Sequence, residues 1–183
     1  MRTRLDCMQM NGLLRNTALL DPAPHQQNAD VPLVLVVDDN PADNRLTVEA
    51  VRQSVRDIAI ESCRSGSEAV DSIRSKSLRH SRLPDLILLD LNMPGLGGHE
   101  VLSIIKKDPN YAAIPVAILS GSTDEAEVRE AYANHANCYI QKPSSMDGYV
   151  SCVSACARFW LTVSLSPNVA NDRVQDHYWA TRE

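Results

Sequence analysis

Two hydrophobic patterns alternate along the middle of the chain. Short apolar runs with little polar alternation are typical of strands buried on both faces of a parallel sheet. Between them, apolar residues recur every three or four positions, as on one face of a helix. The runs predict strands at Leu33–Val37, Ile58–Cys63, Leu86–Asp90, Val116–Leu119 and Cys138–Ile140. The periodic segments predict helices at Asn44–Val55, Ser67–Lys76, Glu100–Lys107, Asp124–Asn134 and Ser145–Val163.

Local signals support the helix starts. Asn40 precedes Pro41, which places a capping residue before a proline at the first helical position. Ser122 with Glu125 three residues later predicts a capping box. Five strands alternating with five helices predict a doubly wound α/β sheet. We therefore expect one folded domain over residues 31–167, a flexible extension over 1–30 and a C-terminal tail over 168–183.

Composition narrows the class of protein. The chain has 183 residues, with 44% hydrophobic and 22% charged residues, which suits one globular domain with tails. Its 18 Lys and Arg against 23 Asp and Glu give a net charge of −5, which argues against a nucleic-acid-binding surface. We see no apolar run long enough for a membrane span and no signal peptide. Five cysteines without CxxC spacing fit a reducing cytosol, so we expect a cytoplasmic protein.

Polar residues collect where the predicted strands end. Asp38 and Asp39 follow the first strand, Asp90 ends the third, Ser120 ends the fourth and Lys142 follows the fifth. In a parallel sheet these carboxyl ends share one rim, which is where such folds bind ligands. Three crowded carboxylates repel one another unless a cation joins them. A hard divalent ion with oxygen ligands, Mg²⁺, is the natural partner.

The same rim favours phosphoryl transfer to or from an aspartate. The ammonium and the hydroxyl add an anion site beside the metal, and this combination stabilises a transferring phosphoryl group. Asp90 is the best nucleophile candidate because Leu88, Leu89 and Leu91 flank it on a central strand. Asp38 and Asp39 are expected to hold the metal.

The segment from about residue 31 to 167 resembles the receiver domain of two-component response regulators. The matching segments are Val36–Asn40, Leu89–Pro94, Leu119–Gly121 and Lys142-Pro143. The resemblance implies a flavodoxin-like five-stranded sheet with strand order 2-1-3-4-5. It also implies a signalling protein that catalyses only its own phosphorylation and dephosphorylation.

The resemblance assigns roles at the rim. It implies that Asp90 accepts a phosphoryl group from the phosphohistidine of a sensor histidine kinase. It implies that Mg²⁺ binds to Asp39, Asp90 and the backbone carbonyl of Asn92, with Asp38 acting largely through water.

The resemblance further implies a switch and an unusual peptide bond. Ser120 and Tyr139 are expected to change arrangement together on phosphorylation. The bond between Lys142 and Pro143 is expected to be cis, which is rare enough to be a sharp test.

A narrower resemblance rests on the segments Asp39–Asp43, Arg45-Leu46, Glu49-Ala50 and Phe159–Val163. They are similar to segments of the single-domain regulators that partner bacterial phytochromes, which are typically homodimers without an output domain. Ser120 departs from the threonine usual there but keeps the hydroxyl. The residues after Pro167 are too few for a DNA-binding domain, so we expect signalling through protein contacts.

The last predicted helix carries a second apolar line. Cys152, Cys156, Phe159 and Val163 follow one another at i, i+4, i+7 and i+11. Because a surface helix normally has one apolar stripe, the second predicts a dimer or partner face. Cover by the Tyr178-Trp179 segment is the alternative.

Two other functions remain open at this point. One is a receiver-like scaffold that works without phosphorylation. The other is a Mg²⁺-dependent aspartyl-phosphate hydrolase of the haloacid dehalogenase type. That family usually places its nucleophile in Asp-x-Asp after the first strand, whereas this strand ends in Asp38-Asp39-Asn40 and no cap insertion is visible.

Overall fold

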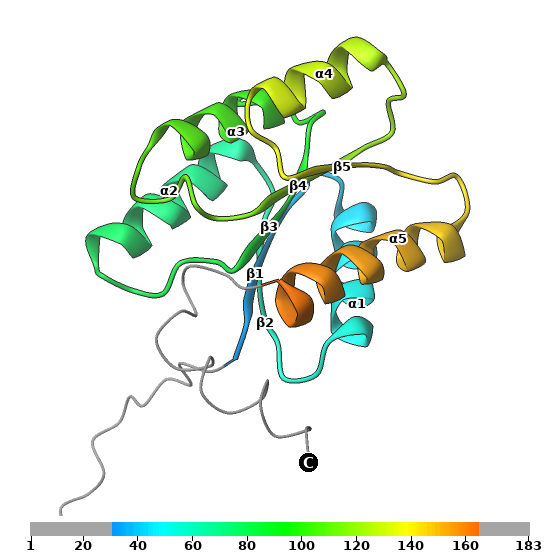
Figure 1. The fold of residues 1–183 in the computed structure, drawn as a ribbon, viewed down its shortest axis with the longest axis horizontal. Coiled ribbons are helices and arrows are strands. Elements are labelled where there is room, and N and C mark those ends of the chain that lie inside the picture. Colours follow the sequence, from blue (N-terminus) through cyan, green and yellow to red (C-terminus); the bar gives the residue numbers. More distant parts are fainter. Residues whose placement is uncertain (1–30, 165–183) are drawn as a thin grey trace, which may run out of the picture.

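A five-stranded parallel sheet forms the centre of the molecule (Figure 1). The computed structural model describes residues 31–164, so the predictions for 1–30, for the 168–183 tail and for Tyr178-Trp179 lie outside the described residues. The strand order is β2-β1-β3-β4-β5, which confirms the predicted sheet. The strands are β1 Leu33–Val37, β2 Ala59–Cys63, β3 Leu86–Asp90, β4 Val116–Ser120 and β5 Cys138–Gln141. The helices are α1 Pro41–Ser54, α2 Gly66–Leu78, α3 Gly98–Lys107, α4 Glu125–Ala133 and α5 Met146–Arg158.

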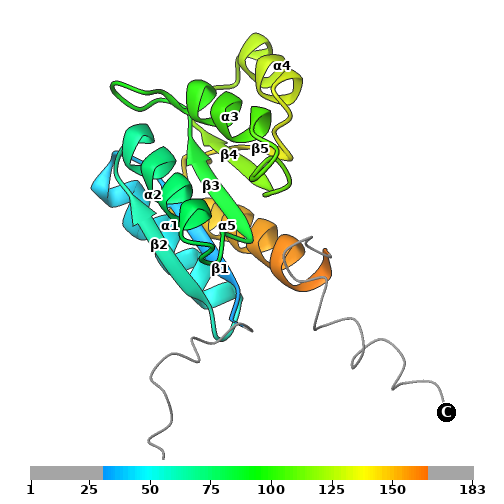
Figure 2. The ribbon, with the colours of Figure 1, turned by 90° about the vertical axis from the view of Figure 1, so that its left-hand side faces the viewer.

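Helices cover both faces of the sheet, and Figure 2 shows the two layers from the side. Helices α1 and α5 pack on one face, and α2, α3 and α4 lie on the other (Figure 1). On β3, Ile87 and Leu89 belong to the core under α2 and α3, whereas Leu86 and Leu88 belong to the core under α1 and α5. Every residue of β3 is buried, which explains why its sequence shows no polar alternation.

The structure confirms one predicted cap and corrects the other. The Asn40 side chain accepts a hydrogen bond from the amide of Ala42, and Pro41 begins α1. The capping box from Ser122 to Glu125 is wrong, because Asp124 caps α4 through the amide of Ala126. The Ser122 hydroxyl instead accepts from the amide of Asp124. The shift by two residues follows from the presence of a stronger acceptor directly before the helix.

The prediction that the second apolar line forms a dimer or partner face also needs a correction. Cys156 is 9% exposed and packs in the core with Val153 and Ala157, so its assignment to a dimer or partner face is wrong. Its place three residues after Val153 puts it on the same helical stripe as the core residues. After Arg158 the chain continues as a π-helical segment, Phe159–Val163, which changes the periodicity.

The close approach of α3 to β3 requires a glycine. A Cβ at Gly98 would clash with the Asp90 carbonyl and with the Cα of Leu91. We therefore expect Gly98→Ala to lower the free energy of unfolding by about 1–3 kcal/mol, as overpacking does. Gly121→Ala is the matched control because a Cβ there meets nothing within 4 Å. Urea unfolding of both variants tests this, and an equal effect of the two changes would contradict it.

Candidate functional site

The carboxyl ends of β1, β3, β4 and β5 bring the predicted polar side chains together. Asp38 and Asp90 are 2% and 6% exposed, and Ser120 is fully buried. The Lys142 Nζ lies 2.8 Å from Asp38 Oδ2 and 2.8 Å from Asp90 Oδ1. One ammonium therefore bridges the two carboxylates, as the parallel topology predicts.

Local turns orient the two bridged carboxylates. Asp38 Oδ1 accepts from the amide of Asn40 at 2.9 Å, two residues later. Asp90 Oδ2 accepts from the amide of Asn92 at the same distance, again two residues later. Each turn uses one carboxylate oxygen and directs the other at Lys142. Backbone geometry thus presets both side chains before any ligand binds.

Burial and charge act against each other in this cluster. Burial raises the pKa of Asp38 above its ordinary value, hydrogen bonding to Lys142 opposes that rise, and the Asp90 charge adds to it. Burial alone would lower the pKa of Lys142, but hydrogen bonds to Asp38 and Asp90 raise it well above the ordinary value. Lys142 is therefore held as a cation, and this ammonium supplies a positive charge that a further anion at the site needs.

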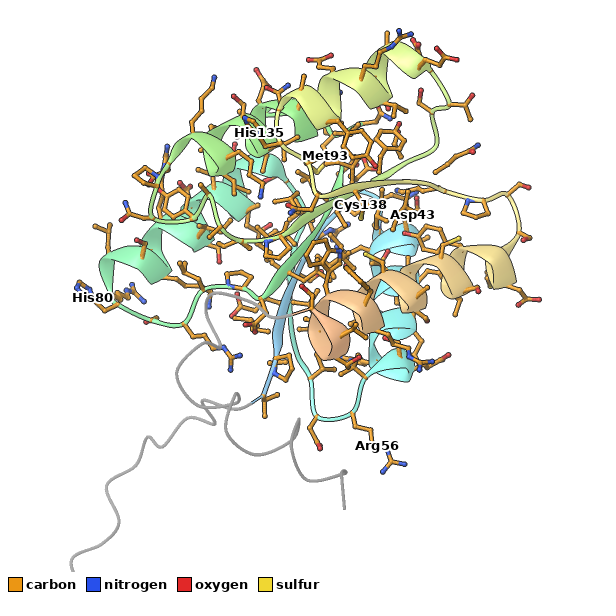
Figure 3. The ribbon with its side chains drawn as sticks, viewed as in Figure 1. Asp43, Arg56, His80, Met93, His135 and Cys138 are labelled. Carbon is orange, nitrogen blue, oxygen red and sulfur yellow. The ribbon has the colours of Figure 1, made fainter. Side chains whose placement is uncertain are left out.

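A third carboxylate, Asp43, was not predicted at this site. Its Oδ2 lies 3.0 Å from Lys142 Nζ, and it belongs to the first turn of α1. Figure 3 shows Asp43 beside the carboxyl ends of the strands. The cap at Asn40 fixes where α1 begins. The signal available in the sequence was therefore that Asp43, three residues after this cap, lies in the first turn of a helix that starts at the rim.

Ser120 and Tyr139 are linked through a residue that the sequence analysis missed. The Ser120 Oγ donates to Glu127 Oε1 at 2.8 Å. The Tyr139 hydroxyl donates to the same oxygen and contacts the Ser122 carbonyl oxygen at 3.1 Å. Burial and the hydrogen bond to Glu127 raise the pKa of Tyr139 above its ordinary value. An acidic residue in the first turn of a helix that follows β4 was the only signal for Glu127.

The predicted cis bond before Pro143 is wrong, because all peptide bonds in the described part of the chain are trans. The trans form is favoured by about 0.5–1 kcal/mol even before proline. Here it is compatible with the site: the Lys142 amide donates to the Ser120 carbonyl at 2.7 Å while Nζ reaches both aspartates.

The donor chemistry at this rim suits a hard divalent cation. Asp38, Asp39, Asp90 and the Asn92 carbonyl offer only oxygen, as Mg²⁺ prefers. Residues 31–164 nevertheless contain no group of three His, Cys, Asp or Glu side chains already arranged around a metal position. The ammonium of Lys142 lies between Asp38 and Asp90 instead. The Mg²⁺ ligand set stays a prediction.

This chain belongs to the response regulator receiver domain family, whose pattern it matches over residues 34–153. It is 36% identical over 151 residues to the probable methanogenesis regulatory protein FilR2 of Methanothrix harundinacea (strain 6Ac), covering 82% of this chain and 97% of that protein. Among solved structures it resembles the phosphorylated cyanobacterial phytochrome response regulator RcpA, with 38% identity, a TM-score of 0.70, and coverage of 75% of this chain and 99% of that one.

A second solved structure adds a metal to the comparison. The Mn²⁺-bound form of response regulator Rcp1, a protein of Synechocystis, is 35% identical with a TM-score of 0.67. The similarity covers 74% of this chain and 99% of that one. The metal belongs to that relative, and the receiver domain family is typically one of signalling rather than catalysis. In the described segment no helix is both long and apolar enough to cross a membrane.

Proposed function

We propose that Asp90 is the phosphoacceptor of a two-component response regulator. The observation that carries this proposal is the buried Asp90 carboxylate at the end of the central strand, with its Oδ1 2.8 Å from Lys142 Nζ. The other oxygen is held by the Asn92 amide. A carboxylate so fixed is a positioned nucleophile, and the ammonium beside it neutralises charge on an incoming phosphoryl group.

The proposed reaction exchanges one phosphorus bond for another. A carboxylate oxygen of Asp90 forms a bond to phosphorus while the bond from phosphorus to the donor's imidazole nitrogen breaks, and the leaving imidazole keeps that electron pair. Lys142 binds a phosphoryl oxygen, and the Ser120 hydroxyl donates to another. Asp38, Asp39, Asp90 and the Asn92 carbonyl would hold Mg²⁺, which supplies further charge neutralisation.

The partner that this chemistry requires is a sensor histidine kinase. Because RcpA is described as a phytochrome response regulator, a phytochrome-type kinase is our specific proposal.

The proposed output is protein contact in the cytoplasm, without binding to nucleic acid or to a membrane. The protein turns over no substrate other than its own acyl phosphate. Tyr139 is proposed to repack with Ser120 when Asp90 is phosphorylated, which changes the surface around α4, β5 and α5.

Incubation with acetyl phosphate tests the proposed function. We expect the intact mass to show one added phosphoryl group with Mg²⁺ present and none after the metal is removed with a chelator. No addition under either condition would favour the scaffold that works without phosphorylation. Transfer from a phosphorylated phytochrome-type kinase, compared with an unrelated kinase, tests the partner.

The exposed end of α5 and the segment after it are our proposed dimer or partner face. Phe159 and Val163 are 51% and 69% exposed, and Cys152 is exposed on the same helix. We expect Val163→Asp to weaken a dimer of this chain at least tenfold, because it places a charge in an apolar contact. Leu78→Asp is the matched control, since Leu78 is 82% exposed on α2.

Light scattering after size-exclusion chromatography, over a range of protein concentrations, measures this effect. A wild-type protein that stays monomeric throughout would contradict the proposed dimer. Equal weakening by Val163→Asp and Leu78→Asp would place the contact elsewhere.

A further inference from the structure

Glu127 joins three elements around a single carboxylate oxygen. It lies in the first turn of α4, and its Oε1 accepts from Ser120 at the end of β4 and from Tyr139 on β5. Both donors are the residues expected to rearrange when Asp90 is phosphorylated. Glu127 is therefore placed to influence the switch, although it contacts neither Asp90 nor Lys142 in any hydrogen bond or ion pair of the described residues.

The Ser120 hydroxyl can donate only one hydrogen bond, and it donates this bond to Glu127. A serine hydroxyl provides one donor and accepts through its lone pairs. Here Oγ donates to Glu127 at 2.8 Å, and it accepts from the Ser122 amide at 3.2 Å and from Asn92 Nδ2 at 3.4 Å. Because Ser120 is fully buried, its hydroxyl is arranged by these protein groups. In this arrangement it has no donor left for a phosphoryl oxygen on Asp90.

Tyr139 depends on the same oxygen. Its hydroxyl proton is shared between Glu127 and the Ser122 carbonyl, and its amide donates to the Tyr132 hydroxyl at 3.2 Å. Tyr132 is itself on α4, so Tyr139 is tied to that helix through both its hydroxyl and its backbone amide. A change at Glu127 therefore reaches Tyr139 and α4 together.

We propose that Glu127 is a positioning residue that holds Ser120 and Tyr139 in the unphosphorylated arrangement by competing with the phosphoryl group for the Ser120 proton. This inference rests on the proposed function. When a phosphoryl group forms on Asp90, the Ser120 hydroxyl turns toward it and leaves Glu127 bonded to Tyr139 alone. This change removes the hydrogen bond that links α4 to the Ser120 hydroxyl at the end of β4. Loss of Glu127 thus favours the phosphorylated arrangement before any phosphoryl group arrives.

Beryllofluoride, a phosphoryl analogue, tests the competition by titration calorimetry at a fixed Mg²⁺ concentration. We expect Glu127→Ala to bind it about tenfold more tightly than wild type, as expected for loss of a competing charge-assisted hydrogen bond. Glu127→Gln keeps a neutral acceptor and should show a smaller gain. Glu130→Ala, three residues along the same helix, is the control and should bind as wild type does. Circular dichroism verifies that each variant is folded.

A double-mutant cycle separates this competition from simple removal of a negative charge. In a Ser120→Ala background there is no hydroxyl proton to compete for, so Glu127→Ala should have little further effect. An equal gain in both backgrounds would overturn the inference, because charge alone would then explain it. Unchanged or weaker binding by Glu127→Ala would also overturn it while leaving the proposed function intact. A wild-type protein that does not bind beryllofluoride with Mg²⁺ would overturn the proposed function and this inference with it.

Discussion

Asp90→Asn is expected to take up no phosphoryl group from acetyl phosphate under conditions that phosphorylate the wild type. The amide keeps the shape of the side chain, so the fold is retained, but it lacks the carboxylate nucleophile. Intact mass measures the loss directly. Asp71→Asn, an exposed change on α2, is the matched control and should be phosphorylated as wild type is.

The same variant has a second expected effect. The Asp90 charge contributes to raising the pKa of Asp38, so its removal should lower that pKa toward the ordinary value. Because Lys142 keeps its ion pairs to Asp38 and Asp43 in this variant, we expect Asp90→Asn to unfold at a temperature no lower than that of the wild type at neutral pH. Retained phosphorylation in Asp90→Asn would show that another residue is the acceptor.

Lys142→Met is expected to cause the largest loss of stability, about 3 kcal/mol at pH 7. Removal of one partner from a buried ion pair leaves the remaining charge uncompensated. The Lys142 side chain is 15% exposed and contacts Asp38, Asp43 and Asp90, of which Asp38 and Asp90 are buried. Urea unfolding measures the loss, with Lys107→Met at an exposed position of α3 as the control.

The loss should depend on pH in a defined direction. Burial already raises the pKa of Asp38 above its ordinary value, and without Lys142 the hydrogen bond and charge that oppose this rise are lost, so the pKa rises further. Ionisation of Asp38 then opposes folding at neutral pH, and this penalty disappears as pH falls through the raised pKa. The difference between wild type and Lys142→Met should therefore shrink at acidic pH. An equal difference at pH 7 and at acidic pH would show that Lys142 stabilises the fold through packing and not through charge.

The fold and most of the rim could be predicted because the signals are local. A strand such as Leu86–Asp90 is a continuous apolar run, and the residue at its carboxyl end shares a sheet edge with the others by topology alone. The meeting of Lys142 with Asp38 and Asp90 follows from that topology.

The remaining features depend on packing that a sequence pattern does not fix. Glu127 reaches Ser120 and Tyr139 only because α4 begins at Glu125 and is rotated toward β5. Cys156 fits either of two stripes on α5, and the contact with Cys138, labelled in Figure 3, lies on the buried one. The bond before Pro143 was inferred from resemblance alone, and the small energy difference between its isomers leaves no local signal.

Borohydride trapping is the most direct test of the claim that Asp90 carries the phosphoryl group. Borohydride reduces an aspartyl phosphate to homoserine, which peptide mass mapping locates on the chain. After incubation with acetyl phosphate and Mg²⁺, we expect homoserine at position 90 and unreduced aspartate at 38, 39 and 43. Homoserine at any of those three positions, or none in a sample whose intact mass shows an added phosphoryl group, would contradict the assignment of Asp90 as the phosphoacceptor.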